Sequence, residues 1–420
     1  MPDDIRGRVF GHIDENWPEQ VAFLREIVGH RSELLAEKGV QLVMKQKFAA
    51  MGLDVDTFDA DMAQLSRLPG FSPIEWGFQG RPQVVGVLKG RGGGKTLVLN
   101  GHSDIVPIEP THHWSVDPLA GVVRDGRMYG RGTQDMKAGV AAMTYAVQAI
   151  QQSEVRLHGD VLLESVIEEE ATGNGTLACI ARGYTGDAAL IPEPFDERIL
   201  IGHVGVLWVR AVIRGYAGHA LGASRMVNAI DKTVQYHGWL RRLEREWNAR
   251  KHPAFADHEH PLNFNPGVIQ GGVWPSSVPS EVTLLTRFAF YPDTTPDEAK
   301  EQFLDFMRAR MQEDHWFREH PIEFTWYGHH DHGYVIPKDD PFVQQVARAH
   351  TDVTGRSPQY LVTTAVTDSR FWNVHVGRPT VCYGPVGANM HGADEWVDLE
   401  SVRRVTKVIA AVILDFCAVA

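Results

Sequence analysis

Apolar residues along much of the chain fall into short runs that alternate with longer stretches of helical spacing. The runs at 96–100, 160–167 and 188–191 are typical of buried strands, and the Ala-rich stretch at 138–150 predicts a buried helix. Further expected elements are helices at 18–28, 40–51, 342–354 and 399–417 and a strand at 379–383. This rhythm of strands and helices implies the α/β class, with a mostly parallel sheet covered by helices on both faces.

The pattern changes near residue 205, where long strands of alternating polarity replace the short apolar runs. The elements expected there are strands at 204–213 and 282–290 and helices at 228–247 and 296–311. Their order indicates a small α+β insert with an antiparallel, ferredoxin-like sheet. We therefore predict a larger domain formed by residues 1–204 and 328–420, interrupted by an inserted domain at 205–327.

Composition and charge narrow the possible functions. Hydrophobic residues make up 43% of the 420 positions, enough for a sizeable core, and no apolar run approaches the length of a membrane span. The net charge of −12 argues against nucleic acid and anionic membranes as partners. No secretory signal is visible at the N-terminus, and Cys179, Cys382 and Cys417 lie far apart in apolar surroundings. These features favour a reducing cytoplasm over a disulfide framework.

Five polar clusters come just after predicted strands, where open α/β sheets place their sites. They are 101–104 (GHSD), 130–139 (GRGTQDMKAG), 168–170 (EEE), 192–194 (PEP) and 390–395 (MHGADE). Each alone has an ordinary explanation, such as a surface His–Asp pair, a helix N-terminus or a solvated run of charges. However, three carboxylates that end an apolar strand repel one another unless a cation lies among them.

Taken together, the clusters offer a set of metal ligands without cysteine. The candidates are His102, Asp135, Glu170, Glu193 and His391. Nitrogen and carboxylate oxygen ligands fit zinc or a related divalent ion at a hydrolytic site. An odd number of ligands suits two metals that share one carboxylate, an arrangement that polarises a carbonyl and acidifies water. We expect two divalent ions per chain, zinc first, with cobalt or manganese as alternatives.

The order and spacing of the five motifs resemble a zinc-dependent family over nearly the whole chain. That family contains acetylornithine deacetylase, succinyl-diaminopimelate desuccinylase, aminoacylase and glutamate carboxypeptidase. The resemblance implies that Asp135 bridges both metals. It also implies that His102 and Glu193 complete one metal site, and that Glu170 and His391 complete the other.

The same resemblance assigns further roles. Glu169 is expected to be the general base and the Asp135–Met136 peptide to be cis. Independently of the resemblance, Asp104 faces the same way as His102 in extended chain, so we expect it to support that ring as a catalytic residue. Residues 215–220 (GYAGHA) resemble part of the family's lid and dimerisation domain. We therefore expect a homodimer in which His219 reaches the partner's active site and helps to stabilise the oxyanion. Without that motif, His219 is more simply a structural or surface residue.

The substrate side departs from the family pattern at two positions. Ser277 stands where relatives carry an Asn before Val-x-Pro, and Ala289 stands where the family arginine is expected. Arg287 lies two residues before Ala289 on the same strand face, and Arg370 belongs to a D-x-R turn that also resembles the family. We assign Ser277, Arg287 and Arg370 to substrate binding. The departures argue against assuming an amino-acid substrate.

Two histidine-rich segments resemble metal sites but lie outside the family's ligand set. They are 329–332 (HHDH) and 112–113 (HH), and we expect both to be solvated loops. The glycine-rich segment 92–96 (GGGKT) does not complete a phosphate loop, because Lys89 stands where the first glycine is required.

The sequence therefore predicts a cytoplasmic, metal-dependent amidohydrolase that removes a small acyl group from an N-acylated amino acid or amine. A dipeptidase or carboxypeptidase of the same family is the alternative. A catalytically silent binding protein is the rival from another class, yet Glu169 and all expected ligands are present. A serine hydrolase is disfavoured because the chain has no G-x-S-x-G motif.

Overall fold

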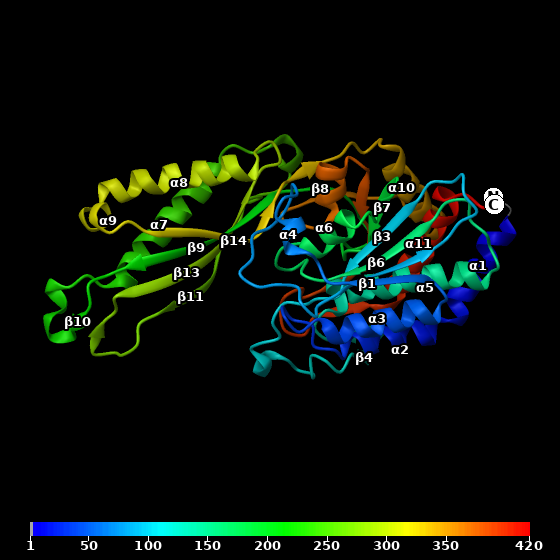
Figure 1. Cartoon of the computed structure of the whole chain (residues 1–420), viewed down its shortest axis with the longest axis horizontal. Coiled ribbons are helices and arrows are strands. Elements are labelled where there is room, and N and C mark those ends of the chain that lie inside the picture. The colour runs from blue at the N-terminus through cyan, green and yellow to red at the C-terminus, as the bar shows by residue number, and fades with distance from the viewer. Residues whose placement is uncertain (1–2) are drawn as a thin grey trace.

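Two sheets lie one beyond the other along the molecule in the computed structural model, which describes residues 3–420 (Figure 1). The strands of the larger sheet are β1 (Asp54–Phe58), β2 (Gln83–Leu88), β3 (Leu97–His102), β6 (Val161–Val166), β7 (Ala188–Ile191), β8 (Ile199–His203), β15 (Tyr334–Val335), β16 (Tyr360–Thr363) and β17 (Thr380–Cys382). Their order is β1-β2-β6-β3-β7-β17-β8-β15, with β16 beside β8. The central pairs β6–β3, β3–β7 and β7–β17 are parallel, which confirms the predicted α/β class. Antiparallel pairs lie towards both edges.

Helices cover the large sheet and bury most of its apolar residues. They are α1 (Asp3–Glu15), α2 (Trp17–Val28), α3 (Lys38–Ala50), α4 (Met62–Leu65), α5 (Ala138–Gln152), α6 (Asn174–Ala181), α10 (Pro341–Thr354) and α11 (Leu399–Phe416). Helix α5 packs against α11 and is buried along residues 138–150. It begins close to the end of β7, because a Cβ on Gly139 would fall 2.2 Å from the carbonyl oxygen of Pro192. This close approach brings the start of α5 to the carboxyl ends of the central strands.

A smaller antiparallel sheet is formed within residues 205–331. Its strands are β9 (Gly205–Arg214), β11 (Phe264–Gly271), β13 (Glu281–Phe290) and β14 (Glu323–Asp331), and its helices are α7 (Ala229–Asn248) and α8 (Pro296–Glu313). The strand order is β11-β13-β9-β14, and both helices pack on one face around a core that includes Tyr236, Phe288 and Phe303. This βαββαβ arrangement confirms the predicted ferredoxin-like insert. The domain boundaries after residues 204 and 327 stay predictions, and β14 continues beyond the second.

The expectation of a solvated loop at 329–332 is wrong for its first three residues, which belong to β14. His329 and Asp331 are only 6% and 0% exposed, and Nδ1 of His329 lies 2.5 Å from Oδ2 of Asp331. Two polar side chains that form a hydrogen bond with each other can be buried in a strand. His112 and His113 lie in an exposed turn, as expected.

Candidate metal centre and active site

The carboxyl ends of neighbouring parallel strands bring the expected metal ligands together. His102 ends β3, Glu169 comes three residues after β6, and Glu193 comes two residues after β7. Asp135 lies in the turn Thr133–Lys137, which leads into α5. All four side chains are buried, so three carboxylates and one imidazole lie together where little water reaches them. The cause is the strand order β6-β3-β7, which sets three strand ends side by side.

Asp135 lies between two imidazoles. Its Oδ1 is 3.1 Å from Nε2 of His102, and its Oδ2 is 3.3 Å from Nε2 of His391. On the far sides, Glu193 Oε1 is 3.6 Å from Nε2 of His102, and Glu170 Oε2 is 3.1 Å from Nε2 of His391. The five side chains therefore form two halves that meet at one carboxylate.

The spacing of these donor atoms suits metal ions. Ligand atoms of His102, Asp135 and Glu170 all lie within 4.8 Å of one another, and so do those of His102, Glu169 and Glu193. The donors are nitrogen and oxygen only, the set that zinc, cobalt and manganese accept. Glu169 belongs to the second group, so distances alone do not separate its role from that of Glu193.

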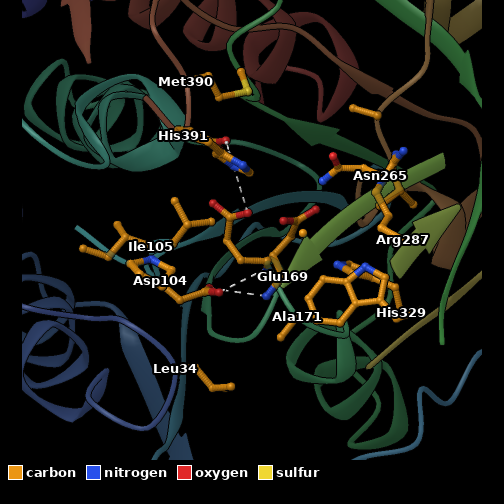
Figure 2. A pocket seen from close by; sticks show the side chains of 18 of the residues that line it. Leu34, Asp104, Ile105, Glu169, Ala171, Asn265, Arg287, His329, Met390 and His391 are labelled. Atoms are coloured by element: carbon orange, nitrogen blue, oxygen red, sulfur yellow. Dashed lines mark hydrogen bonds and ion pairs between the residues drawn. The ribbon is translucent and has the colours of Figure 1, made fainter. Parts of the chain in front are cut away.

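Asp104 holds this arrangement from behind. Its carboxylate accepts hydrogen bonds from the backbone N–H groups of Glu169 at 3.3 Å and Glu170 at 3.2 Å, drawn as dashed lines in Figure 2. One of its oxygens lies 3.5 Å from Nδ1 of His102, which is also 3.1 Å from the backbone oxygen of Asp104. A carboxylate in this position fixes the orientation of the ring and leaves Nε2 for a metal.

The three consecutive glutamates point to different partners. Glu168, which has a left-handed φ of 70°, turns into the protein and lies 2.7 Å from Nη1 of Arg81. It also accepts a hydrogen bond of 2.8 Å from the indole N–H of Trp76. Glu169 and Glu170 instead face the His102 and His391 halves of the site. The strained turn at Glu168 thus separates one structural glutamate from two that face the cavity.

Electrostatics at the site favour a bound cation. Burial raises the pKa of Glu169 well above its usual value, and nearby His102 opposes this effect. Burial raises the pKa of Glu193 in the same way, with the charge of Asp135 adding to it. The charge of Glu170 raises the pKa of His391 to about 11. Carboxylates outnumber imidazoles here, so a positive ion would relieve their mutual repulsion.

Glu395 secures the loop that carries Asp135. Its carboxylate accepts hydrogen bonds from the backbone N–H groups of Gly132, Gln134 and Asp135, and it pairs with Arg131 at 2.6 Å. The Asp135–Met136 peptide is cis, as the family resemblance implied. The last residue of the 390–395 motif therefore fixes the loop of the 130–139 motif.

A cavity of about 670 Å³ opens over these residues, between the large and the small sheet. Asp104, Ile105, Glu169 and His391 lie on one side, while Asn265, Arg287 and His329 lie across from them (Figure 2). Aromatic residues contribute much of the remaining wall, namely Trp76, Phe195, Trp208 and Tyr327. The site therefore combines a charged floor with a largely apolar wall, as small-molecule sites commonly do.

Arg287 is the predicted substrate-binding residue that borders this cavity. Its Nη2 donates a hydrogen bond of 2.9 Å to the carbonyl oxygen of Thr364, and burial lowers its pKa to about 10. Arg370 is not brought to the cavity wall. Its guanidinium lies 2.7 Å from Asp331 and 3.3 Å from Asp368, deep in the protein. We therefore drop Arg370 from the substrate-binding residues.

His219 and Ser277 also lie away from the cavity of their own chain. They pair with each other across a short ribbon formed by β10 (Gly218–His219) and β12 (Ser277–Val278). This ribbon occupies the end of the small domain farthest from the large sheet (Figure 1). A role for either residue in the reaction would require a second subunit.

Sequence reasoning missed Trp76, Trp208, Asn265 and His329 as cavity residues. Trp208 and His329 come from neighbouring strands of the small sheet, and Asn265 pairs in register with Arg287. That pairing of β11 with β13 is the signal that links Asn265 to a predicted site residue. Trp76 lies in an irregular segment and gave no signal.

The chain matches known proteins over most of its length. The model of peptidase family M20/M25/M40 matches residues 98–415. An N-formyl-4-amino-5-aminomethyl-2-methylpyrimidine deformylase of Bacillus subtilis is 31% identical, covering 95% of this chain and 98% of that protein. A succinyl-diaminopimelate desuccinylase of Methylibium petroleiphilum is 26% identical, covering 92% of this chain and 95% of that protein.

Solved structures share the fold at lower identity. A dipeptidase of Saccharomyces cerevisiae superposes with a TM-score of 0.80 at 15% identity, covering 98% of both chains. Human carnosine dipeptidase 1 gives a TM-score of 0.76 at 18% identity, covering 98% of this chain and 99% of that one. Because the family model spans most of the sequence, the predicted relationship is confirmed, and the chain belongs to peptidase family M20/M25/M40.

Proposed function

We propose that the chain is a metal-dependent amidohydrolase that removes a small acyl group from the nitrogen of an amine or amino acid. The observation that carries this proposal is the Asp135 carboxylate lying between His102 and His391, with Glu169 beside them at the floor of the cavity. A dipeptidase is the second candidate, favoured by the shared fold of the dipeptidases. The deacylase is preferred because the two relatives found by sequence similarity, a deformylase and a desuccinylase, both remove acyl groups.

The residues present fit two divalent metal ions that share Asp135. His102 and Glu193 would complete one site, and Glu170 and His391 the other. The distances of both histidines from Asp135 and of each histidine from its glutamate allow this. Zinc, cobalt and manganese all accept this donor set. When bound, such ions polarise the scissile carbonyl and lower the pKa of water.

The chain's own groups would carry the proton and hold the geometry. Glu169 takes a proton from the attacking water and returns it to the leaving amine, because its carboxylate faces the cavity and lacks a cationic partner as close as that of Glu170. Asp104 keeps both the glutamate segment and His102 in place. His219 of a second subunit would donate to the oxyanion, which makes the active form a homodimer.

The wall of the cavity suits a substrate with a flat aromatic ring. Trp208 and Tyr327 form an edge-to-face pair with ring centroids 5.7 Å apart, and Trp76 adds a third ring. An N-formylated aminomethylpyrimidine, as named for the relative from Bacillus subtilis, has that character. Arg287 also borders the cavity and could pair with a carboxylate, so an N-acyl substrate that carries a carboxylate is the competing candidate.

The surface and the cysteines bear on assembly and location. Leu221 and Val273 are 92% and 95% exposed close to the His219 ribbon, a surface that a partner subunit would cover.

Within residues 3–420, no helix is both long and apolar enough to cross a membrane. The three cysteines are free and buried, which suits a reducing compartment such as the cytoplasm.

The test is a hydrolysis screen of the purified protein after loading with zinc, cobalt or manganese. The substrates are N-formyl, N-acetyl and N-succinyl amines, each with and without an α-carboxylate, together with dipeptides. Faster release of amine from one N-acyl series than from any dipeptide supports the deacylase. Preference for dipeptides would select the second candidate instead.

A further inference from the structure

The small-sheet side of the cavity carries a buried polar chain that the proposed reaction does not use. Nδ1 of His329 lies 2.5 Å from Oδ2 of Asp331, and Oδ1 of Asp331 lies 2.7 Å from Nη2 of Arg370. All three residues are buried, and only His329 borders the cavity. The imidazole is therefore the cavity end of a His–Asp–Arg chain.

A bulge in β14 aims this imidazole at the cavity. Trp326 pairs with Val209 and His330 pairs with Leu207, so the three residues 327–329 all face the single residue Trp208. Gly328 has a φ of 61°, and a Cβ there would fall 2.5 Å from the Trp208 ring. Glycine is thus required at the bulge, a device that often redirects side chains beside active sites.

The bulge gathers three rings around one part of the cavity. The centroid of the Trp208 ring is 4.9 Å from that of His329 and 5.7 Å from that of Tyr327, both in edge-to-face geometry. His329 stands across the cavity from Asp104 and Ile105 (Figure 2). The part of a substrate that extends from the scissile amide to this wall would meet aromatic faces and one imidazole.

The hydrogen-bonding state of His329 follows from its partners. Its Nδ1–H donates to Asp331, whose negative charge is already compensated by Arg370. A neutral imidazole that donates from Nδ1 presents the lone pair of Nε2 as an acceptor. Within residues 3–420, no group bonds to that Nε2.

We propose that His329 is a substrate-recognition residue whose Nε2 accepts a hydrogen bond from an N–H group on a flat heteroaromatic ring packed against Trp208 and Tyr327. The substrate class is then an N-acylated amine that carries an amino-substituted aromatic heterocycle. Asp331 and Arg370 act through His329 as positioning residues. This inference rests on the proposed deacylase function and assigns a partner to one group of its substrate.

The test compares two substrates on three forms of the holoenzyme. The substrates are the N-formyl derivative of 4-amino-5-aminomethyl-2-methylpyrimidine and the same compound without the ring amino group. The enzymes are wild type, His329→Phe, which keeps a ring but no acceptor, and His329→Gln, which keeps an acceptor. Affinity for the two free amine products is measured by calorimetry as a readout that does not depend on hydrolysis.

We expect wild type to prefer the amino-substituted compound by roughly ten- to a hundredfold in kcat/KM and to show a similar ratio in product affinity. His329→Phe should lose this ratio, because its loss in kcat/KM is larger for the amino-substituted compound than for the compound without the amino group. His329→Gln should retain part of it. If His329→Phe does not fold, a ratio that falls in His329→Gln still supports the inference, and an unchanged ratio overturns it.

Other outcomes separate this inference from the proposed function. An unchanged ratio in a folded His329→Phe, or no ratio in wild type, overturns the role of His329 but leaves a deacylase in place. Selective binding of the amino-substituted product without hydrolysis of any N-acyl amine supports the recognition role and overturns the deacylase.

Discussion

The Nε2 atom of His102 lies 3.1 Å from one carboxylate oxygen of Asp135. The other oxygen of that carboxylate faces His391 at 3.3 Å, so one side chain serves both halves of the site. Loss of Asp135 should consequently affect two metal positions, whereas loss of a residue at either end should affect one.

The first prediction concerns metal content. Asp135→Ala should lower the bound metal from two ions per chain towards none. It should also reduce activity by more than about a hundredfold, because mutating a residue that only hydrogen-bonds to a metal ligand already lowers metal affinity or activity about 10- to 100-fold. Glu193→Ala should spare the half that contains Glu170 and His391. Metal analysis by mass spectrometry after dialysis measures the metal content of both variants. The control is Asp339→Ala, which replaces an exposed carboxylate. Full occupancy in Asp135→Ala would contradict a bridging role.

The second prediction separates two adjacent glutamates. Glu169→Gln should keep both metals and its melting temperature but lose about 10²- to 10⁴-fold in kcat, because it removes the group that transfers the proton. Glu168→Gln should show the opposite pattern, because Glu168 anchors Trp76 and Arg81. Its melting temperature should fall while kcat changes little. Steady-state kinetics, metal analysis and thermal unfolding of the two variants decide the matter, and a metal-free Glu169→Gln would mean that Glu169 is a ligand.

Much of the large domain follows from local patterns in the sequence. Strand β3 and helix α5 match the predicted ranges within two residues, because an unbroken apolar run and an Ala-rich helix have few alternative environments. The clustering of His102, Glu169 and Glu193 also follows, since strand ends in a parallel sheet meet at one edge. Strands β2, which lies between β1 and β6, and β16, which lies beside β8, were not predicted, because their pairing depends on distant segments rather than on a local period.

The cavity wall was the part that the sequence concealed. His329 looked like a solvated residue because its partners, Asp331 and Arg370, become a buried chain only when the end of β14 packs on the large domain. Arg370 was assigned to substrate binding, but Asp331 and Asp368 already pair with its guanidinium. The local sequence shows which side chains are polar, but the tertiary structure decides which of them already have hydrogen-bond partners.

The third prediction concerns stability at acid pH. His203 is fully buried, and burial lowers its pKa from 6.5 to about 4. Above pH 6.5 both folded and unfolded chains hold it neutral, but between pH 6.5 and 4 only the unfolded chain takes up the proton. Stability should therefore fall by up to about 3 kcal/mol as the pH falls through that window, and the loss should level off below it.

Urea unfolding of wild type and His203→Gln at several pH values measures this contribution. The variant should lose less stability between pH 6.5 and 4 than wild type does, whatever its stability at neutral pH. His315→Gln, which replaces an exposed imidazole, is the matched control and should follow wild type. Parallel curves for wild type and His203→Gln would show that His203 is not responsible.

The fourth prediction asks whether the active site is built across a dimer. His219 is exposed at the far end of the small domain, beside Leu221, Val273 and Trp274, which are 92%, 95% and 67% exposed. If it completes the site that contains Glu169 of the partner, each single variant is impaired at both sites. In a mixed dimer of Glu169→Ala and His219→Ala, one site receives both defects and the other receives neither.

Random reassortment of equal amounts makes about half of the dimers mixed, each with one intact site of two, so activity should recover to about a quarter of wild type. The variants are dissociated, mixed and reassociated, and turnover is compared with each variant alone. Mixing Glu169→Ala with Asp135→Ala is the control, because both defects lie on the same side of the interface and no intact site can form. If the first mixture stays as inactive as this control while labelled subunits show that exchange took place, His219 does not act across the interface. Since it lies away from the cavity of its own chain, it would then have no place in the reaction.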